Sequence, residues 1–236
     1  MEDSLKDIIP HFSGRFVSDP ELIREKLLGV KAYIFDWDGV FNNGLKDPSG
    51  TSLFNEVDAM GTNLLRFSHY LRTGELPVVF VISGEMNQAA SKLAAREHFN
   101  GVYSGFKYKP EALDHLAAAY NIKASEVAFF FDDVLDLSLA ALAGVRIMVG
   151  RAANPLMTDY VVKNRLADYI TACDGNNHGL REGIELLMGI GGHFTDAVEE
   201  RMNFTEVYTT YLARRNEAIP KYFITKHKKI TEQTIP

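Results

Sequence analysis

The chain is poor in several features that define whole classes of protein. It has a single cysteine, Cys173, among 236 residues, which excludes an internal disulfide framework and fits a reducing compartment. Because no partner motif accompanies Cys173, an ordinary core or surface thiol is the simpler interpretation than a nucleophile. No apolar run approaches the ~20 residues of a membrane-spanning helix, and the amino terminus lacks the apolar core of a signal peptide. We therefore expect a cytoplasmic protein without a membrane partner.

Positive charge is also scarce. The chain has 25 Lys and Arg against 31 Asp and Glu, a formal net charge of -6. A dedicated nucleic-acid-binding protein would usually be basic, so we expect no nucleic-acid partner, although local lysines and a metal can still favour an anionic substrate. No glycine-rich phosphate loop follows the first predicted strand, which disfavours a nucleotide-binding module of flavodoxin-like topology. The remaining composition, with 46% hydrophobic residues, is ordinary for a globular chain with one substantial core.

Short apolar runs alternate with helix-like patterns through the middle of the chain. Strands are predicted at residues 33–35, 78–82, 101–103, 127–131, 145–149 and 160–162. Helices are predicted between them at residues 61–72, 87–98, 110–120 and 137–143. Strands that alternate with helices are typical of a parallel sheet with right-handed crossovers and helices on both faces. We therefore predict an α/β protein with a Rossmann-like three-layer parallel sheet.

The two ends of the chain lie outside this alternation. Residues 1–29 are predicted to form an N-terminal appendage whose short helix starts at Asp19-Pro20. Residues 30–190 form the core, and residues 191–236 a helical C-terminal extension with a basic, aromatic tail at 221–230, most simply solvated. Within the core, the turn signals Asn42-Asn43-Gly44 and Asp47-Pro48-Ser49-Gly50 predict a projecting β-hairpin in residues 40–56.

Polar residues stand where the predicted strands end. They are Asp36 and Asp38 after the first strand, Ser83 after the second, Lys109 before a helix, and Asp132, Asp133 and Asp136 after a later strand. Taken singly, a serine or aspartate after a strand is most often a helix N-cap, and a lysine before proline is most often on the surface. Together they would meet at the carboxyl edge of a parallel sheet, where ligands bind. Carboxylates so close together stay ionised most easily around a divalent cation with a preference for oxygen ligands, such as Mg²⁺.

In their order and spacing these residues resemble the motifs of the haloacid-dehalogenase-like (HAD) hydrolases. The matching segments are Phe35-Asp36-Trp37-Asp38-Gly39-Val40, Val81-Ile82-Ser83-Gly84, Lys109-Pro110 and Phe131-Asp132-Asp133-x-x-Asp136. The resemblance implies a magnesium-dependent hydrolase of phosphate esters. It assigns Asp36 as the nucleophile that forms an aspartyl-phosphate, and Asp38 as the acid and base.

The same resemblance implies roles for the other strand-end residues. Ser83 and Lys109 would hold the transferring phosphoryl group. The metal ligands would be Asp36, the backbone carbonyl of Asp38, and Asp132, while Asp133 and Asp136 would complete the outer shell or orient Lys109. The gaps from Asp38 to Ser83 and from Ser83 to Lys109 leave no room for a cap domain.

Without a cap domain, the chain looks similar to 3-deoxy-D-manno-octulosonate (KDO) 8-phosphate phosphatase and its relatives that act on sialic-acid-like 9-phosphates. Further matches are Phe54-Asn55-x-x-Asp58-x-x-Gly61 and Gly179-Leu180-Arg181-Glu182, although the second could be a plain helix start. The resemblance implies a small sugar phosphate as substrate, a homotetramer, and a hairpin that closes a neighbouring active site. It implies substrate contacts at Asn42, Gly84, Asp58 and Arg181.

Four positions depart from that family pattern. Phe131 replaces a glycine, Glu85 and Val57 replace arginines, and Asn42 replaces a hydroxyl residue. They leave open a second hypothesis, in which the chain is a catalytically impaired HAD-like protein with a role in assembly or regulation.

Overall fold

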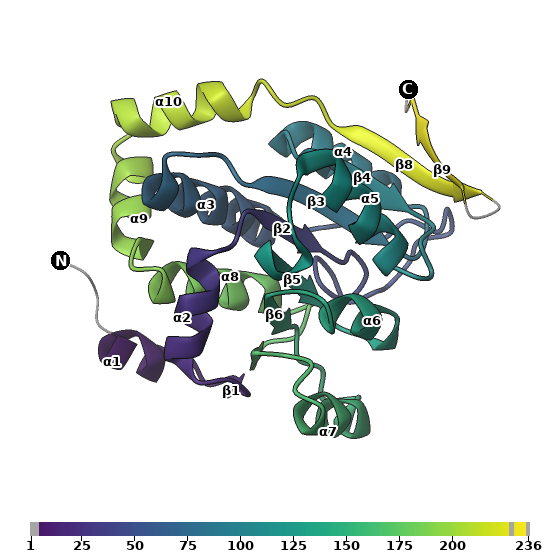
Figure 1. The fold of residues 1–236 in the computed structure, drawn as a ribbon, viewed down its shortest axis with the longest axis horizontal. Coiled ribbons are helices and arrows are strands. Elements are labelled where there is room, and N and C mark those ends of the chain that lie inside the picture. The colour runs from purple at the N-terminus through teal and green to yellow at the C-terminus, as the bar shows by residue number, and fades with distance from the viewer. Residues whose placement is uncertain (1–4, 227–228, 235–236) are drawn as a thin grey trace.

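A single mixed sheet organises the computed structural model, which describes residues 5–226 and 229–234 (Figure 1). Within these residues the sheet has nine strands in the order β1-β7-β6-β5-β2-β3-β4-β8-β9. Every pair from β7 to β8 is parallel, and only the outer strands β1 and β9 run antiparallel to their neighbours. The predicted α/β class with a parallel sheet is confirmed.

The strands match the apolar runs of the sequence at the centre of the sheet. The inner strands are β2 (Ala32–Phe35), β3 (Val78–Ser83), β4 (Gly101–Ser104), β5 (Val127–Phe131), β6 (Val145–Met148) and β7 (Tyr169–Ile170). The outer strands are β1 (Arg15–Phe16), β8 (Lys221–Lys226) and β9 (Lys229–Gln233). Every residue of β2 and β5 is buried, as expected for parallel strands that are covered on both faces.

Helices cover both faces of the sheet and bury two separate apolar cores. The helices are α1 (Leu5–Ile8), α2 (Pro20–Leu28), α3 (Glu56–Thr73), α4 (Gln88–Glu97), α5 (Pro110–Tyr120), α6 (Leu137–Ala140), α7 (Pro155–Lys163), α8 (Gly179–Ile190), α9 (Phe194–Met202) and α10 (Glu206–Arg215). One core gathers side chains of α2, α3, α4 and α8 with alternate residues of β2 such as Tyr33 and Phe35. The other gathers α5, α6 and α7 with Ala32 and Ile34. This alternation of β2 side chains between the cores produces three layers.

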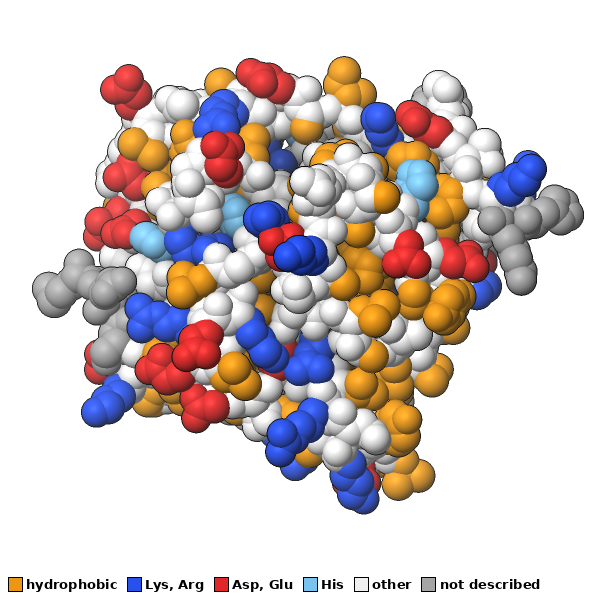
Figure 2. All heavy atoms as spheres, viewed as in Figure 1, with side chains coloured by type: hydrophobic (Ala, Val, Ile, Leu, Met, Phe, Trp, Pro, Cys, Tyr) orange, Lys and Arg blue, Asp and Glu red, His pale blue; other side chains and the backbone are white. Residues whose placement is uncertain are grey.

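The strand order places a crevice beside β2. The chain leaves β2 toward β3 and β4 on one side, and then returns to β5, which pairs with the other side of β2. At such a switch point the loops at the carboxyl ends diverge and leave room for a ligand. On the face drawn in Figure 2, hydrophobic side chains gather over the region of α5 and α6, whereas acidic and basic side chains are interspersed on the side of α2 and α9.

Two local predictions in the core are wrong. The segment predicted as a strand at residues 160–162 lies inside α7, where Val161 is buried, Val162 is partly buried against the same core and Tyr160 is exposed. Residues 36–55 form a loop rather than a β-hairpin, because side chains take the hydrogen bonds that a partner strand would take. Asn42 Oδ1 accepts from the N–H of Gly44 at 2.8 Å, and Asp47 Oδ1 accepts from the N–H of Thr51 at 2.9 Å.

The N-terminal helix forms as predicted. Asp19 caps α2 by accepting from the N–H of Glu21 at 2.8 Å, and Pro20 takes the first helical position. The predicted C-terminal helices are α9 and α10, but the expectation of a solvated tail is wrong for Lys221–Lys226. That segment is β8, which pairs with β4, because Phe223 is buried and stacks on Tyr103 with ring centroids 4.7 Å apart.

Residues 1–4, 227–228 and 235–236, which belong to the two predicted end segments, lie outside the described residues. Among the helices that the structure describes, none is long and apolar enough to cross a membrane.

Candidate functional site

A cavity of about 260 Å³ opens at the carboxyl ends of β2, β3 and β5. Its lining residues are Asp36, Asp38, Gly44, Gly84, Glu85, Lys107, Lys109, Asp132, Asp133, Leu135, Asp136 and Arg151. Asp36 and Asp132 follow directly after β2 and β5, which pair with each other, so the strand register itself brings the two carboxylates together. The sequence prediction that the strand-end residues meet is therefore correct for most of the set.

Three buried carboxylates converge on one point in this cavity. Asp36, Asp132 and Asp136 each offer an oxygen within 4.8 Å of the others. An all-oxygen set of this kind fits a hard divalent cation, and it lacks the nitrogen or sulfur ligands that zinc sites favour. Asp133 does not join the cluster, because its carboxylate accepts from the N–H of Val134 at 2.7 Å on the exposed side of the loop.

The raised pKa values of two carboxyl groups in the cluster also favour a metal site. Burial, followed by repulsion from Asp136, raises the pKa of Asp36 to about 7. Burial, followed by repulsion from Asp36 and Asp136, raises the pKa of Asp132 to about 8. A bound divalent cation would remove this penalty on the ionised forms, so the residues present fit a metal.

Lys109 provides the positive charge at the centre of the site. It immediately precedes α5, whose first helical residue is Pro110, and its side chain is only 1% exposed. Its Nζ donates a hydrogen bond to Asp36 and forms an ion pair with Asp136. Burial would lower the pKa of Lys109, but the two carboxylates outweigh it and raise that pKa, so the ammonium stays charged.

Asp38 is held by the loop that follows it. Lys46 Nζ donates to Asp38 Oδ2 at 2.7 Å, and the Ser52 hydroxyl donates to Asp38 Oδ1. Ser52 is itself fixed, since it accepts from Trp37 Nε1 at 3.1 Å and from Asn87 Nδ2 at 2.7 Å. The Asp38 carboxylate therefore has a defined orientation at the edge of the cavity.

Ser83 and Gly84 stand at the end of β3. Ser83 is almost fully buried, its Oγ accepts from the N–H of Glu85 at 3.3 Å, and it lies behind the cavity wall rather than among the lining residues. Gly84 lines the cavity directly.

Asp136 Oδ2 accepts from the N–H of Asp133 at 3.1 Å, which fixes the turn after β5.

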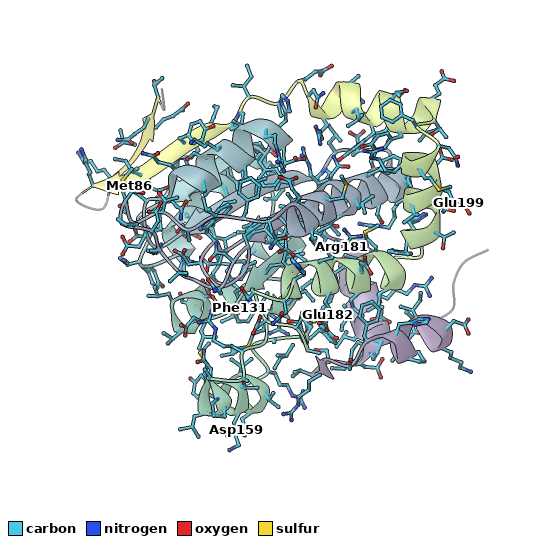
Figure 3. The ribbon with its side chains drawn as sticks, turned by 180° about the vertical axis from the view of Figure 1, so that it is seen from behind. Met86, Phe131, Asp159, Arg181, Glu182 and Glu199 are labelled. Atoms are coloured by element: carbon cyan, nitrogen blue, oxygen red, sulfur yellow. The ribbon has the colours of Figure 1, made fainter. Side chains whose placement is uncertain are left out.

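Three other residues predicted to contact the substrate lie apart from this cavity. Asn42 lines a second cavity of about 370 Å³, formed by the loop at residues 41–55 with Gly175 and Asn176. Arg181 lies at the start of α8 (Figure 3), and its N–H donates at 3.0 Å to Oδ1 of Asp58, which lies at the start of α3. Asp58 and Arg181 line neither cavity.

The departures from the family pattern fit into the fold without blocking the cavity. Phe131 is fully buried and stacks on Phe129, with ring centroids 5.4 Å apart (Figure 3). Glu85 pairs with Lys107 at the mouth of the cavity, so its charge is matched. The carbonyl of Val57 accepts from Arg181 at 3.4 Å, away from the site.

Sequence reasoning missed Arg151, which lines the cavity and donates through Nη2 to Asp132 Oδ2 at 2.6 Å. The signal was available, because Arg151 follows the predicted strand at residues 145–149 in the same way that Asp36 follows the first strand. The rule that strand ends carry functional side chains would have found it.

Neither a family model nor a curated protein matches the chain. Solved structures do. A structure assigned to subfamily III A of the HAD superfamily hydrolases, from Legionella pneumophila, has a TM-score of 0.64 at 25% identity, and the match covers 78% of this chain and 95% of that chain.

Two phosphatase structures share the fold at lower identity. KDO 8-phosphate phosphatase from Moraxella catarrhalis, in complex with magnesium ion, phosphate ion and KDO, has a TM-score of 0.63 at 24% identity and covers 78% of this chain and 98% of that chain. The cobalt-bound phosphatase from Haemophilus influenzae has a TM-score of 0.59 at 22% identity and covers 74% and 99%. Almost all of each neighbour is thus matched, whereas part of this chain is additional to them.

Proposed function

Since this chain has the fold of the haloacid-dehalogenase-like hydrolases, we propose that it is a magnesium-dependent phosphatase that hydrolyses a small sugar phosphate. The observation that carries the proposal is the buried convergence of Asp36, Asp132 and Asp136 on Lys109 at the switch point of the sheet. Three buried carboxylates around one lysine carry excess negative charge, which destabilises the fold unless a cationic ligand completes the site.

In the first step, an oxygen of Asp36 attacks phosphorus, and the bond from phosphorus to the ester oxygen breaks. Asp38 gives its proton to the departing alkoxide, which leaves as an alcohol. The product on the enzyme is an aspartyl-phosphate at Asp36. Lys109 lies against Asp36 and neutralises charge that builds up on the phosphoryl oxygens.

In the second step, water attacks the phosphorus of the aspartyl-phosphate. The Asp38 carboxylate takes a proton from this water, and the bond from phosphorus to Asp36 breaks, which restores the free carboxylate and releases inorganic phosphate. Lys46 and Ser52 keep Asp38 in one orientation through both transfers. The same carboxyl group thus serves as acid and then as base.

Asp36, Asp132 and the backbone carbonyl of Asp38 would hold the metal, with Asp136 close to them. When bound, a divalent ion screens the charge of the attacking carboxylate and of the phosphoryl oxygens. Magnesium is the natural choice for an all-oxygen site, and the phosphatase from Moraxella catarrhalis was solved with it.

The substrate class rests on the neighbours and on the absence of a cap domain. A KDO 8-phosphate-like or sialic-acid-like 9-phosphate would place its phosphoryl group in the cavity and its sugar toward the loop at residues 36–55. Asn42, Gly84 and Arg181 are the proposed contacts to the sugar, and Arg181 would reach the site of an adjoining protomer. Asp58, whose side chain is fully buried, would act by holding the N–H of Arg181. This requires an assembly of several copies, for which we propose a homotetramer. We also propose that the protein is cytoplasmic, and that its core at residues 30–190 carries the additional end segments 1–29 and 191–236.

Phosphate release from a panel of sugar phosphates, with Mg²⁺ and with a chelator, tests the proposal. Wild-type protein should release phosphate only with the metal, and Asp36→Asn should lose at least about a thousandfold in kcat, because the nucleophile is gone. Asp159→Asn, on the exposed surface of α7, is the matched control and should keep full activity. Equal activity in Asp36→Asn and wild type would sink the mechanism. A protein inert on every ester would favour the catalytically impaired alternative.

A further inference from the structure

Arg151 reaches the cavity from the end of β6 and lies beside the turn at Gly39. It follows β6, and its backbone is anchored next to Gly150, whose N–H donates to Thr171 Oγ1 at 2.9 Å. The guanidinium then passes over the turn at Gly39, which has a φ of +92°. A Cβ at Gly39 would lie 2.6 Å from Arg151 Nη2 and 2.0 Å from Asp132 Oδ2, so any side chain there would displace the pair.

The guanidinium keeps most of its hydrogen-bonding capacity unused. Among the residues that the structure describes, only Nη2 of the Arg151 guanidinium has a hydrogen-bond partner, which is Asp132 Oδ2 at 2.6 Å. The Arg151 side chain is 32% exposed, whereas Asp132 is 4% exposed. Arg151 lines the cavity, and a planar guanidinium presents its remaining N–H groups in the fork that matches a phosphate or carboxylate.

The other cations of the cavity are already committed. Lys109 is buried between Asp36 and Asp136. Lys107 is mostly exposed and pairs with Glu85 at the mouth. The lining holds six acidic side chains against three basic ones, so an entering dianion meets a surplus of negative charge that one divalent cation only partly offsets. Arg151 is the cavity-lining cation with the most donors left, because a guanidinium has five N–H groups and an ammonium has three.

We propose that Arg151 binds the phosphoryl group of the substrate, with two N–H groups directed at phosphoryl oxygens while Nη2 remains on Asp132. This inference rests on the proposed phosphatase function. It gives the site a second positive charge from β6, on the side opposite Glu85 and Lys107. The positive charge that the resemblance would place at position 85 is thus supplied from a different strand.

Inorganic phosphate is the probe that isolates this contact, because it carries no sugar. Its binding to the magnesium-loaded protein would be measured by calorimetry in wild type, Arg151→Gln and Arg151→Lys. Loss of a bidentate charged contact should weaken phosphate binding by about 10- to 100-fold in Arg151→Gln, and less in Arg151→Lys, which keeps a point charge. Arg214→Gln is the control, since Arg214 also pairs with one carboxylate, that of Glu75, but lies on α10.

A magnesium titration of the same variants separates binding of phosphate from support of the metal ligands. Removing a cation beside Asp132 should leave Mg²⁺ affinity unchanged or increase it. If Arg151→Gln instead bound Mg²⁺ more weakly and bound phosphate as wild type does, Arg151 would only position Asp132 and the inference would be wrong. It would also be wrong if KM rose for a carboxylated sugar phosphate but not for p-nitrophenyl phosphate, because the contact would then be to a carboxylate.

Failure of the proposed function gives a different pattern. A wild-type protein that hydrolyses no phosphate ester contradicts that function, yet its affinity for inorganic phosphate still decides on Arg151. Wild type that binds no phosphate at all overturns the inference. Thermal unfolding of each variant identifies any that fails to fold, and Arg151→Lys then carries the test.

Discussion

Lys46 Nζ lies 2.7 Å from Asp38 Oδ2, and this contact joins the middle of the loop at residues 36–55 to Asp38, the proposed acid and base near its start. Ser52 of the same loop also donates to Asp38, so the conformation of the loop and the orientation of the Asp38 carboxylate are linked through these two contacts. Lys46 touches neither Asp36 nor the buried cluster, which makes it a positioning residue rather than a catalytic one.

Lys46→Met should lower kcat about tenfold and change KM less than about twofold, because Asp38 loses one of the two groups that orient it. Lys46→Arg should recover most of the loss, since it restores the charge. Lys163→Met removes the lysine of an exposed pair on α7 and should have no effect. Steady-state kinetics decide the matter, and a rise in KM at constant kcat would mean that Lys46 binds substrate instead.

The acidic cluster should make the metal-free protein less stable as the pH rises. The pKa of Asp132 is raised to about 8 by burial and by Asp36 and Asp136, so the folded state binds this proton more tightly than the unfolded chain does. The folded state therefore loses stability as the pH rises from the unfolded pKa of about 4 toward about 8. In chelator, Asp132→Asn should exceed wild type in unfolding free energy by about 1 to 3 kcal/mol at pH 8, with a smaller difference at pH 5.

Mg²⁺ should reduce the difference in unfolding free energy between Asp132→Asn and wild type, because a ligand that binds only the folded state stabilises that state. Wild type should gain several degrees in Tm with Mg²⁺ at pH 8, and Asp132→Asn should gain much less. Asp133→Asn is the control, since its carboxylate lies outside the cluster and asparagine is an equally good cap. A wild-type Tm that ignores both pH and Mg²⁺ between pH 5 and 8 would argue against a metal at this cluster.

The strand ends show how far sequence reasoning reaches. An apolar run that stops at Asp36 predicts both the buried strand β2 and the position of its carboxylate, since the end of a parallel strand fixes where the next side chain points. Lys109-Pro110 likewise predicts a helix start. These signals are local, and the strand register then brings Asp36 and Asp132 together without further information.

The wrong predictions fall on segments whose secondary structure is determined by contacts with residues far away in the sequence. A run of three apolar residues at 160–162 is too short to distinguish a strand from part of a helix, and the packing of Val161 in α7 shows that it is helical. Lys221–Lys226 contains the β-forming run Tyr222-Phe223-Ile224-Thr225, but its lysines suggest a solvated tail, and its partner β4 is more than a hundred residues away in sequence. The strand-end position of Arg151 marks it as a candidate in the sequence, but its pairing with Asp132 follows only from the pairing of β6 with β5.

The carboxylate of Asp168 holds the N-terminal segment on the core. It is fully buried and accepts from Ser18 Oγ at 2.6 Å, Lys26 Nζ at 2.7 Å and Arg146 Nη2 at 2.9 Å. Burial alone would raise the pKa of Asp168, but the hydrogen bonds from Arg146, Lys26 and Ser18 outweigh it and lower that pKa.

Because this folded-state pKa is lowered, the contribution of Asp168 to stability is fully present above its unfolded pKa of about 4 and is lost as the pH falls through the folded value. Asp168→Asn should cost about 2 to 4 kcal/mol at pH 7, since it leaves buried cationic donors short of a charged partner. The deficit relative to wild type should shrink progressively below about pH 5. Denaturant unfolding at several pH values measures it. Asp159→Asn, at an exposed pair, should cost less than about 0.5 kcal/mol. A deficit that stays constant down to pH 3 would show that the charge of Asp168 contributes nothing.

The packing of strand β8 on the sheet should contribute to the stability of the fold. Phe223 is 8% exposed, and its ring lies against Tyr103 and against His115, with ring centroids 5.0 Å apart in the second pair. Phe223→Ala should cost about 3 kcal/mol of unfolding free energy, because it empties a buried aromatic site between β8 and α5.

Ile219→Ala, next to β8 but highly exposed, is the matched control and should change stability by less than about 0.5 kcal/mol. Activity at 25 °C should survive in both variants, because Phe223 lies three strands from Asp36 in the sheet order. If Phe223→Ala costs no more than Ile219→Ala, then β8 leaves the sheet readily in solution. The basic composition of the tail would then describe its behaviour better than the pairing with β4 does.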